Sequence, residues 1–164
     1  MTQSLAEYDF LYDSPTGQLG ICLDKDSITR IVWLEETVPG FSKSSPSNSH
    51  LKKKIILALD NYFKSGLIDE EISLCPQGTA FQEKVWQALK KIPYGSVRTY
   101  GDVAKELNST ESFSGNNSMA CRRNNIPLFI PCHRVVAAKG LGGFMGGHRH
   151  VERKRWLLQH EGIL

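Results

Sequence analysis

Pro131-Cys132-His133-Arg134-Val135-Val136 is the stretch that says most about this chain. A thiol stands directly before an imidazole, at the end of the short apolar run 126–130. The glycine-rich segment 140–147 follows a few residues later. A free cysteine is more often an inert, buried apolar residue. A thiol between an apolar run and a flexible loop is also how a nucleophile is presented at the floor of a pocket.

Further short motifs surround this stretch. They are Phe81-Gln82, Val85-Trp86, Ile92-Pro93-Tyr94-Gly95, Thr99-Tyr100-Gly101 and His160-Glu161-Gly162. Together with residues 131–135 they make the region from about 79 to 162 resemble the 6-O-alkylguanine-DNA alkyltransferases, a family of suicidal DNA-repair methyltransferases. The resemblance implies irreversible transfer of an alkyl group from 6-O-alkylguanine, and from 4-O-alkylthymine, in DNA to Cys132. It implies no cofactor, because the protein is itself the co-substrate.

The resemblance also implies a two-domain fold. Residues 1–76 are expected to form an α/β N-terminal domain of the ribonuclease-H-like kind, with a scaffold role. Residues 77–164 are expected to form a mostly α C-terminal domain of the winged-helix or helix-turn-helix-like kind, which binds DNA and carries the reaction.

Charge is divided unequally between these two halves. Residues 1–78 hold seven Lys and Arg against eleven Asp and Glu, so their net charge is 7 − 11 = −4. Residues 79–164 hold thirteen against six, or 13 − 6 = +7. A basic half is either a well-solvated surface or a surface that meets a polyanion. The motifs favour DNA as that polyanion.

Several classes of protein are disfavoured by composition. No apolar run approaches the ~20 residues of a membrane span, and no signal segment opens the chain. We therefore expect a soluble cytoplasmic or nucleoid-associated protein that makes no membrane contact and is monomeric. The four cysteines lie far apart without a metal-ligand spacing, so neither disulfides nor a metal site is expected.

Local patterns predict the main elements. Alternation predicts a strand around 19–23 and an apolar run predicts another at 31–34, with turns at 15–17 and 24–27. Helical spacing, which puts Leu51, Ile55, Leu59 and Phe63 on one face, predicts a helix from Leu51 that Gly66 stops. Thr79 with Gln82 predicts a capped helix that ends before Pro93. Further helices are predicted at about 99–107, 113–123 and 151–160, the first two as a helix-turn-helix.

The resemblance assigns a proton relay to Cys132, a water molecule, His133 and Glu161, with Asn124 holding the region. The chemistry needs a thiolate, and an ordinary cysteine is only a few per cent ionised at neutral pH. We expect Cys132 and His133 to lie on extended backbone, where neighbouring side chains point to opposite faces. A turn or a water molecule would then have to connect them.

DNA and substrate contacts follow from the same resemblance, which implies minor-groove binding and a guanine flipped out of the duplex. The residues expected to contact DNA or substrate are Tyr100, Gly115, Asn116, Arg122, Arg134, Val135, Gly142, Phe144 and Met145. The chain departs from the family at Gly115, where an arginine that fills the vacated stack is expected. Phe144 and Met145 also replace hydroxyl-bearing residues, which makes the expected pocket more apolar.

Two other functions compete with alkyl transfer. An alkyltransferase-like protein that binds lesions without removing them would lack the nucleophile, so Cys132 argues against it, whereas the altered recognition helix favours it. A thiol hydrolase or protease would turn over, and no additional oxyanion-hole signature is visible in the sequence.

Overall fold

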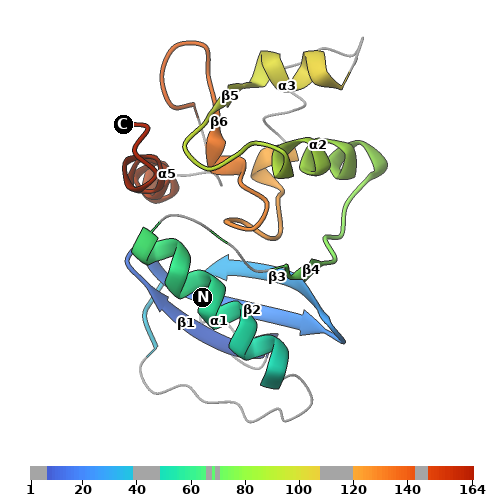
Figure 1. The fold of residues 1–164 in the computed structure, drawn as a ribbon, viewed down its shortest axis with the longest axis vertical. Helices are drawn as coiled ribbons and strands as arrows, with labels where there is room; N and C mark the ends of the chain where they lie inside the picture. The colour runs from blue at the N-terminus through green and yellow to red at the C-terminus, as the bar shows by residue number, and fades with distance from the viewer. Residues whose placement is uncertain (1–6, 39–48, 66–67, 69–70, 108–119, 143–147) are drawn as a thin grey trace. The chain divides into compact units, whose positions relative to one another are not determined.

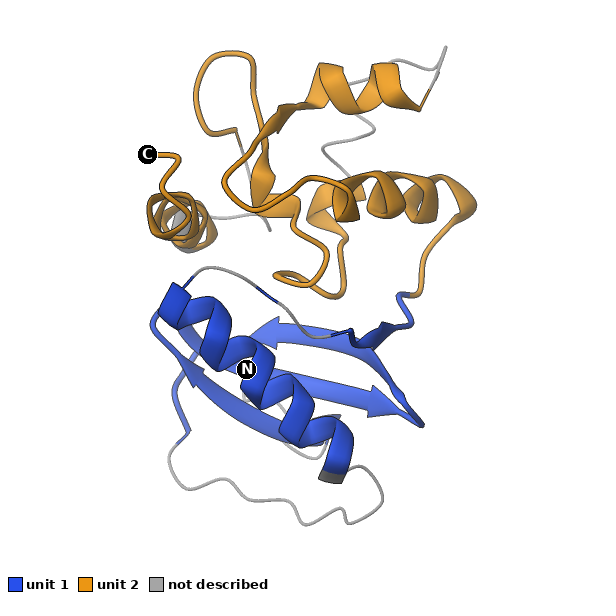
Figure 2. Ribbon diagram, viewed as in Figure 1, with its two compact units in different colours: residues 1–76 blue, residues 77–164 orange. Residues whose placement is uncertain are grey.

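The computed structural model describes residues 7–38, 49–65, 68, 71–107, 120–142 and 148–164. The chain divides into two compact units, Met1–Pro76 and Gln77–Leu164 (Figure 2). None of the described helices has the length and apolar character that crossing a membrane requires.

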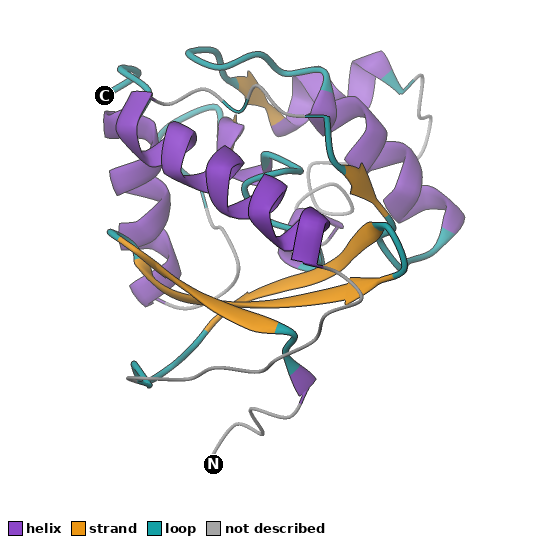
Figure 3. Ribbon diagram, turned by 60° about the horizontal axis from the view of Figure 1, so that its bottom comes forward, coloured by secondary structure: helices purple, strands orange, loops and turns teal. Residues whose placement is uncertain are grey.

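The first unit is built on a four-stranded mixed sheet in the order β1-β2-β3-β4 (Figures 1 and 3). The strands are β1 (Phe10–Ser14), β2 (Gly17–Asp24), β3 (Ser27–Trp33) and β4 (Ser73–Leu74). The first three pair antiparallel and β4 joins β3 in parallel. Two tight turns join the antiparallel strands where the sequence predicts them, and Gly17 and Lys25 adopt positive φ there.

Helix α1 (Ser49–Ser65) lies across this sheet (Figure 1). Its buried face is formed by Ile55, Ala58, Leu59 and Tyr62, which follow the i, i+3, i+4, i+7 spacing of an amphipathic helix. These side chains pack with sheet residues such as Leu19, Ile21 and Ile31, which are essentially fully buried. The predicted helix is confirmed, but Tyr62 rather than Phe63 completes its buried face.

The second unit is mostly helical. Its described elements are α2 (Ala80–Lys90), β5 (Arg98–Thr99), α3 (Tyr100–Glu106), the single 3-10 turn η3 (Cys132–Arg134), β6 (Val135–Val136) and α5 (His148–His160). Strands β5 and β6 pair in parallel. The predicted helices at 79–92 and 99–107 are confirmed, and α5 begins three residues before the predicted 151.

Capping boxes begin both α2 and α3. The Thr79 hydroxyl accepts from the Gln82 backbone N–H at 3.1 Å, and the Gln82 side chain returns the bond to the Thr79 N–H at 2.9 Å. Thr99 and Asp102 repeat the arrangement at 3.0 Å in both directions. Each box fixes where its helix starts, and the second makes Tyr100 the first residue of α3.

The predicted helix at 113–123 falls mostly on residues 108–119, which lie outside the described residues. Residues 120–122 are helical, and Trp86 of α2 donates its indole N–H to the Ala120 carbonyl at 3.0 Å. This buried bond ties the described end of that segment to α2.

Candidate active site

A strained turn at residues 126–130 leads directly into Cys132. Leu128 is buried with φ of 77°, a left-handed conformation that costs a branched residue about 1–2 kcal/mol. The Ile130 N–H bonds the Ile126 carbonyl at 3.0 Å, and the Cys132 N–H bonds the Ile130 carbonyl at 2.8 Å. The chain therefore enters residue 132 already folded back on itself.

Residues 132–134 form the 3-10 turn η3, and the expectation of extended backbone there is wrong. Pro131 (φ −81°, ψ 66°) starts the turn, and the Val135 N–H closes it on the Cys132 carbonyl. An apolar run such as 126–130 is typical of a strand. Here the Ile130 N–H instead bonds the Ile126 carbonyl, so the run forms a compact loop. Cys132 and His133 are consequently both buried inside the unit rather than on opposite faces of a strand.

Asn124 fixes the sulfur of Cys132. Its side-chain Nδ2 donates to Cys132 Sγ at 3.1 Å and to the Ile130 carbonyl at 2.8 Å. Its Oδ1 accepts from the Ile126 N–H at 2.9 Å. One buried amide thus holds both ends of the turn and points a donor at the thiol sulfur.

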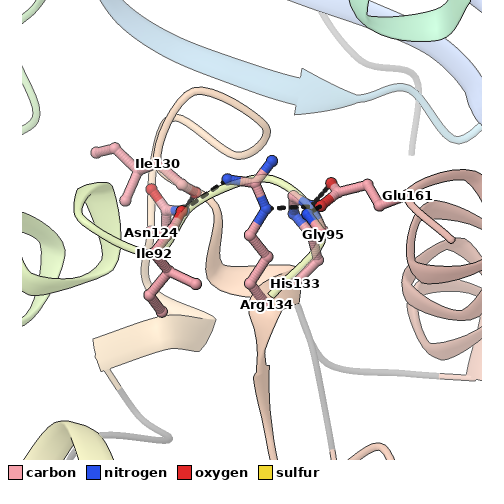
Figure 4. A network of polar contacts seen from close by, with 7 residues as sticks. All are labelled: Ile92, Gly95, Asn124, Ile130, His133, Arg134 and Glu161. Carbon is pink, nitrogen blue, oxygen red and sulfur yellow. Dashed lines mark hydrogen bonds and ion pairs between the residues drawn. The ribbon is translucent and has the colours of Figure 1, made fainter. Parts of the chain in front are cut away.

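Glu161 joins the turn to the end of α5, as Figure 4 shows. Its Oε2 lies 2.6 Å from His133 Nε2, with both side chains fully buried. Its Oε1 accepts from Arg134 Nε at 2.7 Å and more distantly from the Gly95 N–H at 3.4 Å. Arg134 also donates to the Ile92 carbonyl at 2.9 Å. Both oxygens of the carboxylate are therefore engaged within the protein.

The His133 ring is neutral at rest. Burial lowers its pKa below the usual 6.5, against the opposing pull of Glu161. Because a carboxylate can only accept, the ring places its proton on Nε2 and leaves a lone pair on Nδ1. Nδ1 is buried and has no hydrogen-bond partner among the described residues. The imidazole thus has one nitrogen committed to Glu161 and one ready to accept a proton.

The Cys132 thiol is protonated at rest. Burial raises its pKa to about 11, although the Asn124 donor and the Lys154 charge lower it. Cys132 is only 1% exposed, and in this closed site the desolvation of a thiolate outweighs the stabilisation that Asn124 and Lys154 provide. Ionisation must therefore accompany the reaction.

A second group of predicted residues gathers around Tyr100, which is buried at the start of α3. Lys154 Nζ lies 5.9 Å from the centre of the Tyr100 ring and donates to the Val135 carbonyl at 2.6 Å. Gly142 has φ of 72°, and a Cβ there would approach Tyr100 Cε2 and the Ala137 nitrogen to 3.2 Å. Residue 142 therefore lies close to the tyrosine ring in a left-handed conformation that favours glycine.

The structure brings together most of the predicted site residues that it describes. Asn124 bonds to Cys132, and His133 and Arg134 both bond to Glu161, so two hydrogen-bonded groups meet at the η3 turn. Arg122 is exposed on the surface, whereas Arg134 and Val135 are buried and face inward. Gly115, Asn116, Phe144 and Met145 lie outside the described residues. Among the residues that are described, no cluster of His, Cys, Asp and Glu could hold a metal ion.

Sequence reasoning missed Lys154. It stands between Arg153 and Arg155, a run of charge that suggests a solvated helix face. Its spacing gives the better signal, because Lys154, Leu157, Leu158 and Glu161 follow i, i+3, i+4, i+7 and therefore share the buried face of α5.

A buried thiol held by an amide, with a buried imidazole–carboxylate pair beginning at the next residue, is typical of a protein whose chemistry takes place at a cysteine. Residues 80–163 match the family model described as 6-O-methylguanine DNA methyltransferase, DNA binding domain. This match covers more than half of the chain, which therefore belongs to the 6-O-methylguanine-DNA methyltransferase family.

Individual relatives agree over nearly the whole length. A Haemophilus influenzae protein named methylated-DNA–protein-cysteine methyltransferase is 38% identical over 162 residues, or 96% of this chain and 88% of that protein. The crystal structure of Mycobacterium tuberculosis O6-methylguanine methyltransferase has a TM-score of 0.75 at 34% identity, covering 92% of this chain and 90% of that one. The structure of Mycobacterium tuberculosis OGT in complex with DNA gives a TM-score of 0.73 at 31% identity, with the same coverage. The mixed sheet and helices are thus those of an alkyltransferase.

Proposed function

We propose that this protein repairs DNA by moving an alkyl group from 6-O-alkylguanine, or 4-O-alkylthymine, irreversibly to the sulfur of Cys132. The observation that carries the proposal is the buried His133–Glu161 pair at 2.6 Å beside a buried thiol. A lesion-binding protein without transfer activity would not need that pair, and a merely structural cysteine would not need a base beside it.

The proton path follows from the imidazole's two nitrogens. His133 Nδ1 takes the thiol proton through a water molecule as the sulfur attacks the alkyl carbon. A carbon–sulfur bond forms while the bond between the alkyl carbon and the guanine oxygen breaks. Glu161 orients the imidazole and stabilises the charge that it gains.

The released guanine must receive a proton. We propose that Tyr100 supplies it and is reprotonated from the imidazolium through solvent, so that the net proton transfer runs from thiol to guanine. Arg134 is then a positioning residue, since its guanidinium holds Glu161 and the Ile92 carbonyl rather than a substrate. Asn124 likewise positions the sulfur.

DNA recognition extends this proposal to the surface of the second unit. Residues 77–164 would be the DNA-binding and transfer domain, of winged-helix or helix-turn-helix type, with the exposed Arg122 available for phosphate contact. It would bind the minor groove as a monomer and extrude the damaged base. Gly115, Asn116, Gly142, Phe144 and Met145 would contribute to the DNA and pocket surfaces, whereas the fully buried Val135 would support them from within. Residues 1–76 would be a ribonuclease-H-like scaffold.

The test is incubation with a duplex oligonucleotide that contains one 6-O-methylguanine, followed by intact-protein mass measurement. We expect a gain of one methyl group, located at Cys132 by peptide mapping, and no further turnover when DNA is in excess. The matched control is Cys132→Ala, which should bind the lesion and gain nothing. Cys121→Ala, which removes the neighbouring buried thiol, should still accept the group.

The alternatives predict other outcomes. Binding of the damaged duplex without any mass gain would identify a lesion-binding protein. Catalytic turnover without a stable adduct would identify a hydrolase. Methylation that continues in Cys132→Ala at the wild-type rate would refute the assignment of the nucleophile.

A further inference from the structure

Lys154 is the largest charged side chain that the second unit buries completely among its described residues. It extends from α5 to the turn that holds the thiol, where its Nζ donates to the Val135 carbonyl at 2.6 Å. The Val135 N–H in turn donates to the Cys132 carbonyl. The ammonium is therefore linked to the backbone of Cys132 through a single residue, Val135.

Ionisable groups face this ammonium from three elements. The Tyr100 ring comes from α3 at 5.9 Å. Cys132 and His133 come from η3, and both interact electrostatically with Lys154. Cys121 comes from the helical residues 120–122 and is also within electrostatic reach. Burial raises the pKa of Cys121 strongly, so this second thiol stays protonated and does not compete for the charge.

Burying an ammonium is unfavourable unless something nearby gains from it. A methionine would fill similar space without that cost, so packing alone does not account for a lysine here. The group that this positive charge can stabilise is the Cys132 sulfur, which must become a thiolate inside a desolvated site. We propose that the Lys154 ammonium is the cation that stabilises the Cys132 thiolate as it forms, which makes Lys154 a positioning residue of the transfer reaction.

The charge is available at the pH where the protein would act. Burial lowers the pKa of Lys154 to about 8, while the two thiols oppose that shift. The side chain is therefore mostly an ammonium at pH 7 and loses its proton as the pH rises above 8. Lys154 therefore stabilises the Cys132 thiolate below about pH 8 and no longer does so at higher pH.

The experiment measures the rate at which iodoacetamide labels Cys132 between pH 6 and 10, with peptide mass spectrometry to separate the four thiols. Lys154→Met should shift the profile upward by about one pH unit, which is about a tenfold slower labelling at pH 7. Arg155→Met is the matched control, since Arg155 is exposed on the same helix, and it should follow the wild type. Lys154→Gln offers a second neutral side chain.

Lys154→Arg gives an independent measurement with the charge retained. Because a guanidinium stays protonated throughout this range, labelling above pH 9 should be faster than in the wild type, whose lysine is then neutral. A Lys154→Met or Lys154→Gln profile that coincides with the wild type would overturn the inference. If neither neutral variant folds, the Lys154→Arg variant decides. Labelling of Cys132 above pH 9 that is no faster than in the wild type would then overturn the inference.

This inference takes its reaction from the proposed function, but the labelling reports on the thiol alone. A protein whose labelling responds to Lys154 as expected, yet gains no methyl group from DNA, would refute the transferase and leave the role of Lys154 intact.

Discussion

The two units of this protein bury different kinds of side chain. Among the described residues of the first unit, Gln18 is the one buried polar residue, surrounded by an apolar core. The second unit buries six in its described part: Asn124, His133, Arg134, Arg153, Lys154 and Glu161. Both units have apolar cores, so the difference lies in what the second unit adds to its core.

Gln18 shows what a structural buried polar group looks like. Its amide donates to Asp13 of β1 and to the Val38 carbonyl and accepts from the Val38 N–H, so it ties β2 to a neighbouring strand and to the segment after β3. Five of the six buried groups in the described part of the second unit, all but Arg153, instead converge from several elements on Cys132 and its neighbours. Buried ion pairs often contribute little net stability, which indicates that this network is kept for its chemistry.

Glu161→Gln should break the second unit's network with the largest effect. It leaves His133 without a charged orienter and the Arg134 guanidinium without its carboxylate. We expect single-turnover methyl transfer to slow by about 10²–10⁴-fold, the usual contribution of general acid–base groups. Removing one partner of a buried pair should also cost about 3–5 kcal/mol of unfolding free energy. Transfer at the wild-type rate would exclude Glu161 from the relay.

Leu59→Ala is the counterpart in the first unit. Leu59 is fully buried in α1, and its truncation should cost about 2–5 kcal/mol. The stability loss is therefore similar, but the transfer rate per folded molecule should not change. Urea unfolding combined with single-turnover rates separates the two variants. A Leu59→Ala protein that is fully folded and yet slow would show that the first unit contributes to chemistry.

The pH dependence of stability gives a third, smaller test. Because burial lowers the His133 pKa below 6.5, the unfolded chain takes up a proton before the folded one does. The free energy of unfolding should fall below pH 6.5, by up to about 1.4 kcal/mol per pH unit from this residue, until the folded pKa is reached. Urea titrations at pH 7.0 and 5.5 measure the slope. His133→Gln should reduce it, and an unchanged slope would show that another group dominates.

Much of the fold is readable from local sequence. Caps and helical spacing predict α1, α2, α3 and α5, alternation predicts β2, and an apolar run predicts β3. Strand β1 is not predicted from the sequence, because Phe10, Leu11 and Tyr12 are consecutive bulky residues without alternation. Strands β4, β5 and β6 have two residues each and are defined by their partners, which no local pattern shows.

The site is predictable in its chemistry but not in its geometry. The motif around Cys132 names the nucleophile and the relay, whereas the η3 turn depends on long-range packing and on the left-handed Leu128. The direction of the Cys132 pKa shift depends on burial, which the motif does not reveal. The resemblance places Arg134 among the DNA and substrate contacts, and only the fold shows that it holds Glu161.

The two capping boxes provide the smallest and sharpest test, because they separate fold from site within the second unit itself. Thr79→Ala and Thr99→Ala each remove one side-chain acceptor from a helix start, so each should cost about 1 kcal/mol of stability. Only α3 begins with a site residue, since Tyr100 directly follows its cap. Loosening that turn should misplace the tyrosine and slow transfer by about three- to tenfold. Thr79→Ala should leave the rate per folded molecule unchanged. Thermal unfolding and single-turnover rates on one duplex substrate decide the matter, and equal rates in the two variants would mean that Tyr100 is positioned by packing in the core rather than by its helix cap.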